Sequence, residues 1–259
     1  MLIDSHAHLT FPRFDKDRDK LIKNLRKNNI EIVITSGSSV ASSVASVSLA
    51  KKYNNIYASV GIHPVNTNDM DENTIVLLKT LTNNKNVVAI GEIGLDYHYD
   101  YVTKVIQKKW FRRQINLAKE LKLPIVVHDR EANIDTYNII KDELDSNLKG
   151  VIHCYSGDVK VARKYTEMGF YISIAGPVTY KNAKKLKKVA KEIPLRNLFI
   201  ETDSPSLTPA PLYKKRNEPL YVSYVAAMIA ELKDVSVKEV EKRTTENVKR
   251  LYKLKGKYY

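Results

Sequence analysis

Residues Val87–Asp96 read VVAIGEIGLD, an apolar and largely β-branched run that reaches a glycine and then a carboxylate at Glu92. A run of this length bounded by glycine predicts a strand buried on both faces, as in a parallel sheet. Glu92 would lie at the carboxyl end of that strand. A carboxylate buried there is costly unless it is paired or bound to a metal ion.

The same arrangement recurs along the chain, where short apolar runs end in histidine or acidic residues. The runs that predict strands are 2–4, 31–35, 56–60, 87–96, 124–127, 150–152, 170–174 and 197–200. Segments with helical spacing separate them; in one of these the repeating residues are Val40, Val44 and Val47. Eight strands alternating with helices predict a single (β/α)₈ TIM barrel. Periodic segments at 222–232 and 237–251 predict two extra C-terminal helices.

Composition narrows the class of protein. The 259 residues contain 43 Lys and Arg against 29 Asp and Glu, a formal charge of +14 that favours a polyanionic partner such as nucleic acid. The single cysteine excludes an internal disulfide, and no apolar run is long enough to cross a bilayer. With no signal peptide at the start, we expect a cytoplasmic protein with no membrane partner. We expect one domain over residues 1–259, with residues 253–259 as a frayed basic tail.

Active sites of such barrels lie where the carboxyl ends of the strands meet, so side chains scattered in sequence should converge there. The side chains expected at this mouth are His6, His8, His63, Glu92, His128, His153 and Asp203. One histidine beside a strand is usually structural, but five of the six histidines lie at or just beyond predicted strand ends. Imidazole and carboxylate together suit Zn²⁺, Mn²⁺ or Fe²⁺.

Three further residues have less definite roles. His98 stands apart from the strand ends and is expected to pack in a loop or touch substrate. Asp4 lies within the first predicted strand, where a structural role is expected. Glu201 precedes Asp203 by two positions, so it either contacts a metal ion or water or orients a ligand.

The chain resembles the TatD-like metal-dependent deoxyribonucleases, a branch of the amidohydrolase-like barrels. The resemblance covers essentially the full length, and the matching segments follow one another in the family's order. They are Asp4–Leu9 (DSHAHL), Gly61–Pro64 (GIHP), Gly91–Tyr97 (GEIGLDY), His128–Ala132 (HDREA), His153–Gly157 (HCYSG), Glu201–Pro205 (ETDSP) and Arg216–Pro219 (RNEP).

This resemblance implies a site for two divalent ions, Mg²⁺, Mn²⁺ or Zn²⁺. One ion would be held by His6, His8 and Asp203, and the other by His128 and His153. Glu92 would bridge the two, with Glu201 as a further contact, and Asp203 would orient or deprotonate the attacking water. The implied substrate contacts are His63 and Arg130. Independently of the resemblance, we expect the basic run of Lys214, Lys215 and Arg216 to attract and bind the DNA backbone.

The implied activity is hydrolysis of DNA phosphodiester bonds, as a 3′→5′ exonuclease with action at abasic or damaged sites and a role in DNA repair. We expect a monomer that binds DNA through its phosphate backbone, with Tyr97, Tyr99, Tyr155 and Tyr180 available to stack a terminal base. In one loop the sequence departs from the family, because Leu212, Tyr213 and Lys214 replace the usual His-Arg-Gly.

Two other functions share these residues. The same ligand set would serve a metallohydrolase acting on an ester or amide of a small molecule or an aminoacylated RNA, because fold does not fix substrate. A nucleic-acid-binding barrel with a decayed site is the third candidate, and it predicts no bound divalent ion. The charge of +14 favours a polyanionic substrate over a small ester.

Overall fold

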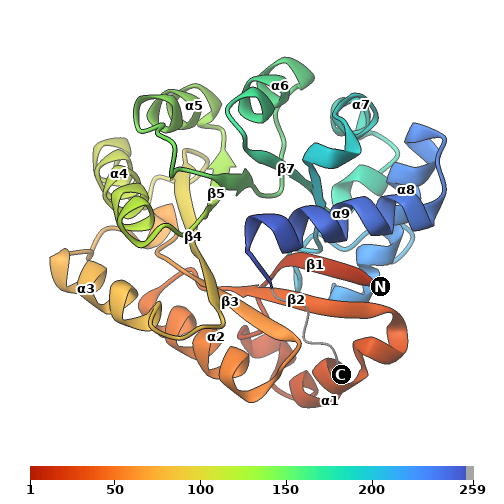
Figure 1. The fold of residues 1–259 in the computed structure, drawn as a ribbon, viewed down its shortest axis with the longest axis horizontal. Helices are drawn as coiled ribbons and strands as arrows, with labels where there is room; N and C mark the ends of the chain where they lie inside the picture. The colour runs from red at the N-terminus through yellow and green to blue at the C-terminus, as the bar shows by residue number, and fades with distance from the viewer. Residues whose placement is uncertain (255–259) are drawn as a thin grey trace.

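The protein is described by a computed structural model covering residues 1–254. Eight parallel strands pair in sequence order into a nearly closed barrel, ringed by helices (Figure 1). A bridge between Ala7 and Ser204 links the first strand to the segment after the last. The predicted TIM barrel is therefore confirmed. The strands are β1 (Leu2–Ala7), β2 (Ile30–Ser36), β3 (Ile56–Val60), β4 (Val87–Asp96), β5 (Ile125–Arg130), β6 (Gly150–Ile152), β7 (Tyr171–Ile174) and β8 (Leu198–Ile200).

Nine α-helices lie within residues 1–254, and the last two are the predicted additions to the barrel. The helices are α1 (Arg18–Asn24), α2 (Val40–Lys52), α3 (Glu72–Leu81), α4 (Lys104–Leu121), α5 (Asn133–Asp142), α6 (Val159–Glu167), α7 (Lys184–Glu192), α8 (Val222–Lys233) and α9 (Val237–Leu251). Short 3₁₀ turns, among them η1 (Pro12–Phe14) and η3 (Pro64–Asn66), occur in the connections.

One end of the barrel interior is apolar. Side chains alternate along each strand, so every second residue points inward. Near the amino ends of the strands these include Ile3, Val88 and Phe199, which form a buried cluster with Val248 and Leu251 of α9. Figure 1 shows α9 lying across this end of the barrel. Because α9 covers the amino end, polar groups in the interior gather toward the carboxyl end.

The strand that predicted the fold has the expected bounds, Val87–Asp96, but Glu92 lies inside it and not at its carboxyl end. Pairing between β4 and β5 shifts register between Ile90 and Ile93, so the segment carrying Glu92 departs from the regular ladder. Just beyond it, Gly94 has a φ of +146°, and a Cβ there would lie 2.0 Å from the carbonyl oxygen of His128. Glycine is required at that point because β4 and β5 approach too closely for a side chain.

Helix α2 corrects an expectation from the sequence. Of the predicted apolar face, Val47 is buried, but Val40 and Val44 are exposed. The buried face consists instead of small residues, including Ser43 and Ala50. Ser43 Oγ donates to the carbonyl oxygen of Gly61, so a small polar side chain fastens the helix closely to the segment after β3.

The C-terminal segment also differs in part from the sequence expectation. Leu254, in the predicted frayed tail, packs against the cluster under α9, and its N–H donates to the carbonyl of Lys249. The remainder of that predicted tail, residues 255–259, lies outside the described residues. Within residues 1–254 no helix combines the length and apolar character needed to cross a bilayer.

Candidate metal centre

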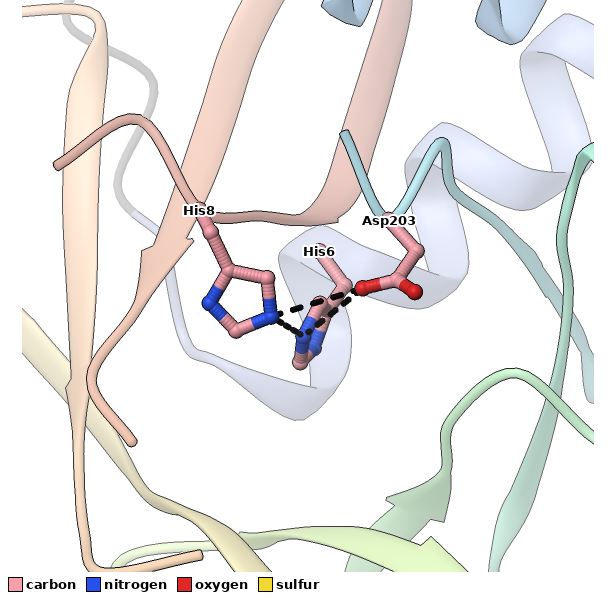
Figure 2. Close-up of side chains that lie close together, drawn as sticks. All are labelled: His6, His8 and Asp203. Carbon is pink, nitrogen blue, oxygen red and sulfur yellow. Dashed lines mark hydrogen bonds and ion pairs between the residues drawn. The ribbon is translucent and has the colours of Figure 1, made fainter. Parts of the chain in front are cut away.

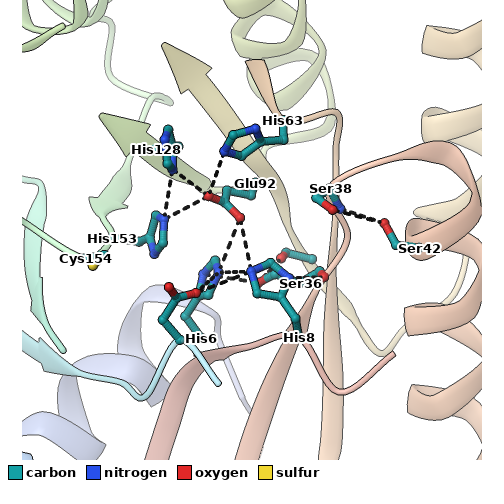
Figure 3. A network of polar contacts seen from close by, with 12 residues as sticks. His6, His8, Ser36, Ser38, Ser42, His63, Glu92, His128, His153 and Cys154 are labelled. Atoms are coloured by element: carbon teal, nitrogen blue, oxygen red, sulfur yellow. Dashed lines mark hydrogen bonds and ion pairs between the residues drawn. The ribbon is translucent and has the colours of Figure 1, made fainter. Parts of the chain in front are cut away.

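Glu92 lies at the centre of a cluster of five histidines drawn from separate strands and strand ends (Figure 3). One carboxylate oxygen, Oε1, is 2.8 Å from His128 Nδ1 and 2.9 Å from His153 Nε2. The other, Oε2, is 3.5 Å from His6 Nε2 and 3.4 Å from His8 Nε2. The two oxygens therefore face opposite halves of the cluster, which is the arrangement a bridging carboxylate needs.

The first half consists of His6, His8 and Asp203 (Figure 2). The two Nε2 atoms are 3.3 Å apart, and Oδ1 of Asp203 is 3.7 Å and 3.4 Å from them. At metal–nitrogen distances of about 2.0–2.1 Å, donors around one tetrahedral ion lie roughly 3.3–3.4 Å apart. The observed spacings therefore fit one ion between these atoms.

The second half consists of His128 and His153 with the other oxygen of Glu92. His128 Nδ1 and His153 Nε2 lie 3.4 Å apart, again the spacing of two donors that share an ion. The two rings of this half come from different strands: His128 lies on β5, and His153 follows β6.

In each histidine ring, the contact made by the nitrogen that points away from Glu92 shows whether the other nitrogen is free to bind a cation. A neutral imidazole donates from one nitrogen and offers a lone pair on the other. His8 Nδ1 faces the backbone carbonyl of Ser36 at 3.2 Å, so it must carry the proton. His128 Nε2 faces Oδ2 of Asp96 at 3.1 Å. Both rings thus turn a lone pair toward the centre, as a metal ligand must.

His6 and His153 can adopt the same orientation. His6 Nδ1 lies 3.2 Å from Oγ of Ser36, and His153 Nδ1 lies 3.4 Å from Oε1 of Glu201, although the latter pair is not aligned for a hydrogen bond. The lone pairs of His6 and His8 then face each other at 3.3 Å, where no hydrogen bond can join them. A cation between the two rings removes that repulsion, so the donor set fits a metal ion.

His63 has the opposite orientation. Its Nδ1 accepts from the N–H of Val65 at 3.3 Å, so the proton of the neutral ring is on Nε2, 3.5 Å from Glu92 Oε1. Burial and the nearby His128 lower the pKa of His63 to about 3, which keeps it neutral. His63 is therefore placed to donate a hydrogen bond in the cavity, not to offer a lone pair.

The charge state of Glu92 follows from its neighbours. Burial alone would raise the pKa of its carboxyl group, but His153, His63 and His128 outweigh burial and hold the pKa well below its usual range. The group is consequently an anion throughout the neutral range. An anion surrounded by imidazoles is the state needed to share two cations.

A cavity of about 600 Å³ opens above this cluster, lined in part by His8, His63, Glu92, His153 and Asp203. Arg130 lies on its wall.

The predicted basic loop, Lys214–Arg216, does not line the cavity as Arg130 does. Lys214 and Lys215 are exposed and do not line the cavity. Arg216 is bound through both terminal nitrogens to Asp17 at 2.7 Å, with its guanidinium carbon 4.4 Å from the ring centre of Phe14. Arg216 therefore anchors the loop to the segment after β1 and does not line the cavity, and its substrate contact stays a prediction.

The family model for TatD-related DNase matches residues 3–253. The chain belongs to this family. It is a TatD-family metal-dependent hydrolase, and the site above contains its candidate metal ligands.

Individual relatives agree with the family assignment. The chain is 46% identical over 254 residues to YabD of Bacillus subtilis, an uncharacterized metal-dependent hydrolase, covering 98% of this chain and 100% of the relative. The crystal structure of YJJV, a TatD homolog from Escherichia coli, matches with a TM-score of 0.93 and 26% identity over 98% of each chain. A TatD-family hydrolase from Entamoeba histolytica matches with a TM-score of 0.85 and 25% identity, over 97% of each chain.

The hydrogen-bond partners of Glu201 and Asp4 in this TatD-family site indicate the roles of these two acidic residues, which the sequence does not decide. Glu201 accepts from the backbone N–H of Cys154 at 2.5 Å and from Ser173 Oγ at 2.6 Å, and it lies beside His153. Glu201 therefore lies behind the His153 ring, without a hydrogen bond to its Nδ1. Asp4 accepts from the N–H and the hydroxyl of Thr202, and burial raises the pKa of Asp4 to about 8. These contacts agree with the structural role expected for Asp4.

Sequence reasoning missed several residues of the site. In the sequence Asp96 is only a part of the Gly91–Tyr97 motif, yet in the structure its carboxylate contacts His128. Ser36 contacts both His6 and His8, and nothing in the sequence around it indicated this. Phe11 stacks on His8, with ring centres 4.8 Å apart. Asp203 adopts a φ of +55°, a strained conformation for a residue with a side chain, which sites rather than regular elements tend to contain.

Proposed function

We propose that the chain is a deoxyribonuclease that hydrolyses phosphodiester bonds of DNA with the help of two divalent ions, Mg²⁺, Mn²⁺ or Zn²⁺. The observation that carries this proposal is the pair of donor groups sharing Glu92 beneath an open cavity with Arg130 on its wall. Two neighbouring cation positions suit displacement at a phosphate, where both the attacking and the leaving oxygen carry charge. The formal charge of +14 suits a polyanionic substrate.

When bound, the two ions would supply the positive charge that polarises the phosphate and acidifies the attacking water. The chain's own residues do the remaining work. Nε2–H of His63 and the guanidinium of Arg130 hold non-bridging phosphate oxygens. Asp203, with 17% of its side chain exposed, accepts the proton of the water at a carboxylate oxygen. Burial would raise the pKa of Asp203, but His8 and His153 lower it, so the group starts as the base.

The finer features of the proposal depend on the family resemblance. They are 3′→5′ exonuclease polarity and cleavage at abasic or damaged sites. We further propose a monomer as the active form. Lys214 and Lys215, exposed on the loop after β8, would add to the attraction of the DNA backbone at a distance.

The test is digestion of end-labelled single- and double-stranded DNA by the metal-free protein resupplied with Mg²⁺, Mn²⁺ or Zn²⁺. We expect shortening from the 3′ end with at least one ion, weakened strongly by salt because backbone contacts displace counterions. Glu92→Gln should abolish it and Asp203→Asn should lower it roughly 10²- to 10⁴-fold, while the fold remains intact by circular dichroism. A wild-type protein that leaves DNA whole with every ion, or that hydrolyses only carboxylic esters in a parallel panel, would overturn the proposal.

A further inference from the structure

The loop between β4 and α4 exposes two stacked aromatic rings at the rim of the barrel mouth. Tyr99 and Tyr101 lie with ring centres 5.1 Å apart and planes within 5° of parallel. Tyr99 is 39% exposed and Tyr101 is 70% exposed. Exposed aromatic surface is available for binding, and two parallel rings offer a flat face to a planar ligand.

This tyrosine pair adjoins the wall of the catalytic cavity through Arg130. Arg130 lines the cavity, and its guanidinium carbon is 5.0 Å from the ring centre of Tyr99. His98 lies edge-on to the same ring, with centres 4.8 Å apart, and is fixed by a 2.7 Å contact between its Nδ1 and Glu131. The surface therefore runs without a break from the cavity to a cation and then to two aromatic rings.

The other tyrosines named from the sequence do not offer such a face. Tyr97 uses its hydroxyl to bind Asp135 at 2.7 Å, and its ring is covered by Lys104 at 4.4 Å. Tyr155 is buried. Tyr180 and Tyr213 lie with their ring planes tilted by 46°, so they offer no common flat face, and the Tyr180 hydroxyl donates to a backbone carbonyl.

We propose that Tyr99 and Tyr101 form a base-stacking subsite for single-stranded DNA next to the cleaved end. This inference rests on the proposed deoxyribonuclease function. Arg130 holds a phosphate at the cavity wall, and an unpaired base of an adjoining nucleotide stacks on the tyrosine pair. Every base has a π-face, so the subsite accepts any sequence. In a duplex the bases are already stacked on their neighbours, so the subsite favours single strands or frayed ends.

The experiment uses wild-type protein and the variant Tyr99→Ala/Tyr101→Ala on short single-stranded oligonucleotides. One baseless spacer is placed at each position in turn from the cleaved end, and kcat and KM are measured separately. For wild type we expect one or two positions at which the spacer lowers kcat/KM roughly 5- to 100-fold, the range of one base–aromatic stack. The double variant should lose a similar factor on the intact strand, mainly through KM, and should no longer respond to the spacer there.

Two controls separate stacking from loss of structure. Tyr99→Phe/Tyr101→Phe keeps both rings and should retain wild-type kinetics. Tyr213→Ala removes a ring that is 58% exposed on a different loop, and it should leave the spacer profile unchanged. The small phosphodiester bis(p-nitrophenyl) phosphate cannot reach the tyrosine pair, so its hydrolysis should be equal in all four proteins.

The outcomes distinguish the two proposals. If wild type cleaves neither DNA nor the small phosphodiester, the proposed function fails. If wild type cleaves DNA with a flat spacer profile, or the double alanine variant keeps the wild-type profile, the stacking subsite is wrong while the function stands. Loss of small-substrate hydrolysis in the alanine variant would also contradict the subsite, because it would assign the loop to the catalytic centre or its folding.

Discussion

The two halves of the metal centre obtain their negative charge in different ways. In the half made by His6 and His8, a carboxylate from Asp203 faces the ion position directly, and the far side of each ring meets a neutral oxygen of Ser36. In the half made by His128 and His153, the far sides of the rings face carboxylates, those of Asp96 and Glu201. Glu92 is common to both (Figure 3).

This difference separates two tasks. A carboxylate behind a histidine raises the basicity of the ring, so under the proposed function the second half holds an ion. A carboxylate that faces the proposed ion position and the cavity can also accept a proton, so the proposal assigns the activation of water to the first half. The comparison therefore predicts unequal consequences when one acid at a time is neutralised.

Replacing the shared acid should have the largest effect, because it removes charge from both halves. Glu92→Gln is expected to lose bound metal at both positions and to reduce DNA hydrolysis to background. Metal content by plasma mass spectrometry and cleavage of end-labelled DNA provide the measurement. Retention of two ions per chain would mean that Glu92 does not bridge.

The proton-accepting acid of the first half should come next. Asp203→Asn is expected to lower kcat roughly 10²- to 10⁴-fold, the usual contribution of a general base. The ion between His128 and His153 should remain, since its donors are untouched. A variant that lost both ions, or that cleaved DNA at the wild-type rate, would contradict the division of tasks.

Neutralising the acids behind the second half should weaken metal binding without removing a reacting group. Asp96→Asn and Glu201→Gln are each expected to weaken binding at one ion position roughly 10- to 100-fold. Activity should return when excess metal is added, which a damaged catalytic group would not allow. Ser36→Ala is the matched control for the first half and should have a smaller effect, because it removes only a neutral partner of His6. Equal losses of metal affinity in all three variants would contradict the proposed difference between the two halves.

The smallest effect concerns the loop that follows Asp203, which Arg216 ties to Asp17. The hydrogen bonds from Arg216 hold the pKa of Asp17 below its usual 3.8. A lowered pKa stabilises the fold above that pH, and the contribution is lost as the pH falls through the folded-state value. Asp17→Asn should therefore cost about 0.5–1 kcal/mol at pH 7, the scale of an exposed ion pair.

Urea unfolding of wild type and Asp17→Asn between pH 7 and pH 3 checks this ion pair. The difference in unfolding free energy should narrow below pH 3.8. A difference that stayed constant across this range would show that the ionised carboxylate is not what anchors the loop. Metal content of the second half should be unchanged in this variant.

The sequence by itself determined the barrel and the identity of the converging side chains. Apolar runs ending in Glu92, His128 or His153 identify strands, and parallel strands in a barrel bring their carboxyl ends to one mouth. Strand and helix periodicity is local, so it can be seen without the fold. The bounds of β3 and β6 follow directly from such runs.

Only the tertiary structure decided which nitrogen of each ring faces the centre. That choice depends on contacts such as Ser36 with His8 and Asp96 with His128, between residues 28 and 32 positions apart. The same is true of Arg216, whose basic character predicts a substrate contact but whose guanidinium is paired with Asp17, 199 positions away. Charge and ligand type are properties of single residues, whereas tautomer, pairing and exposure are set by neighbours that the fold brings together.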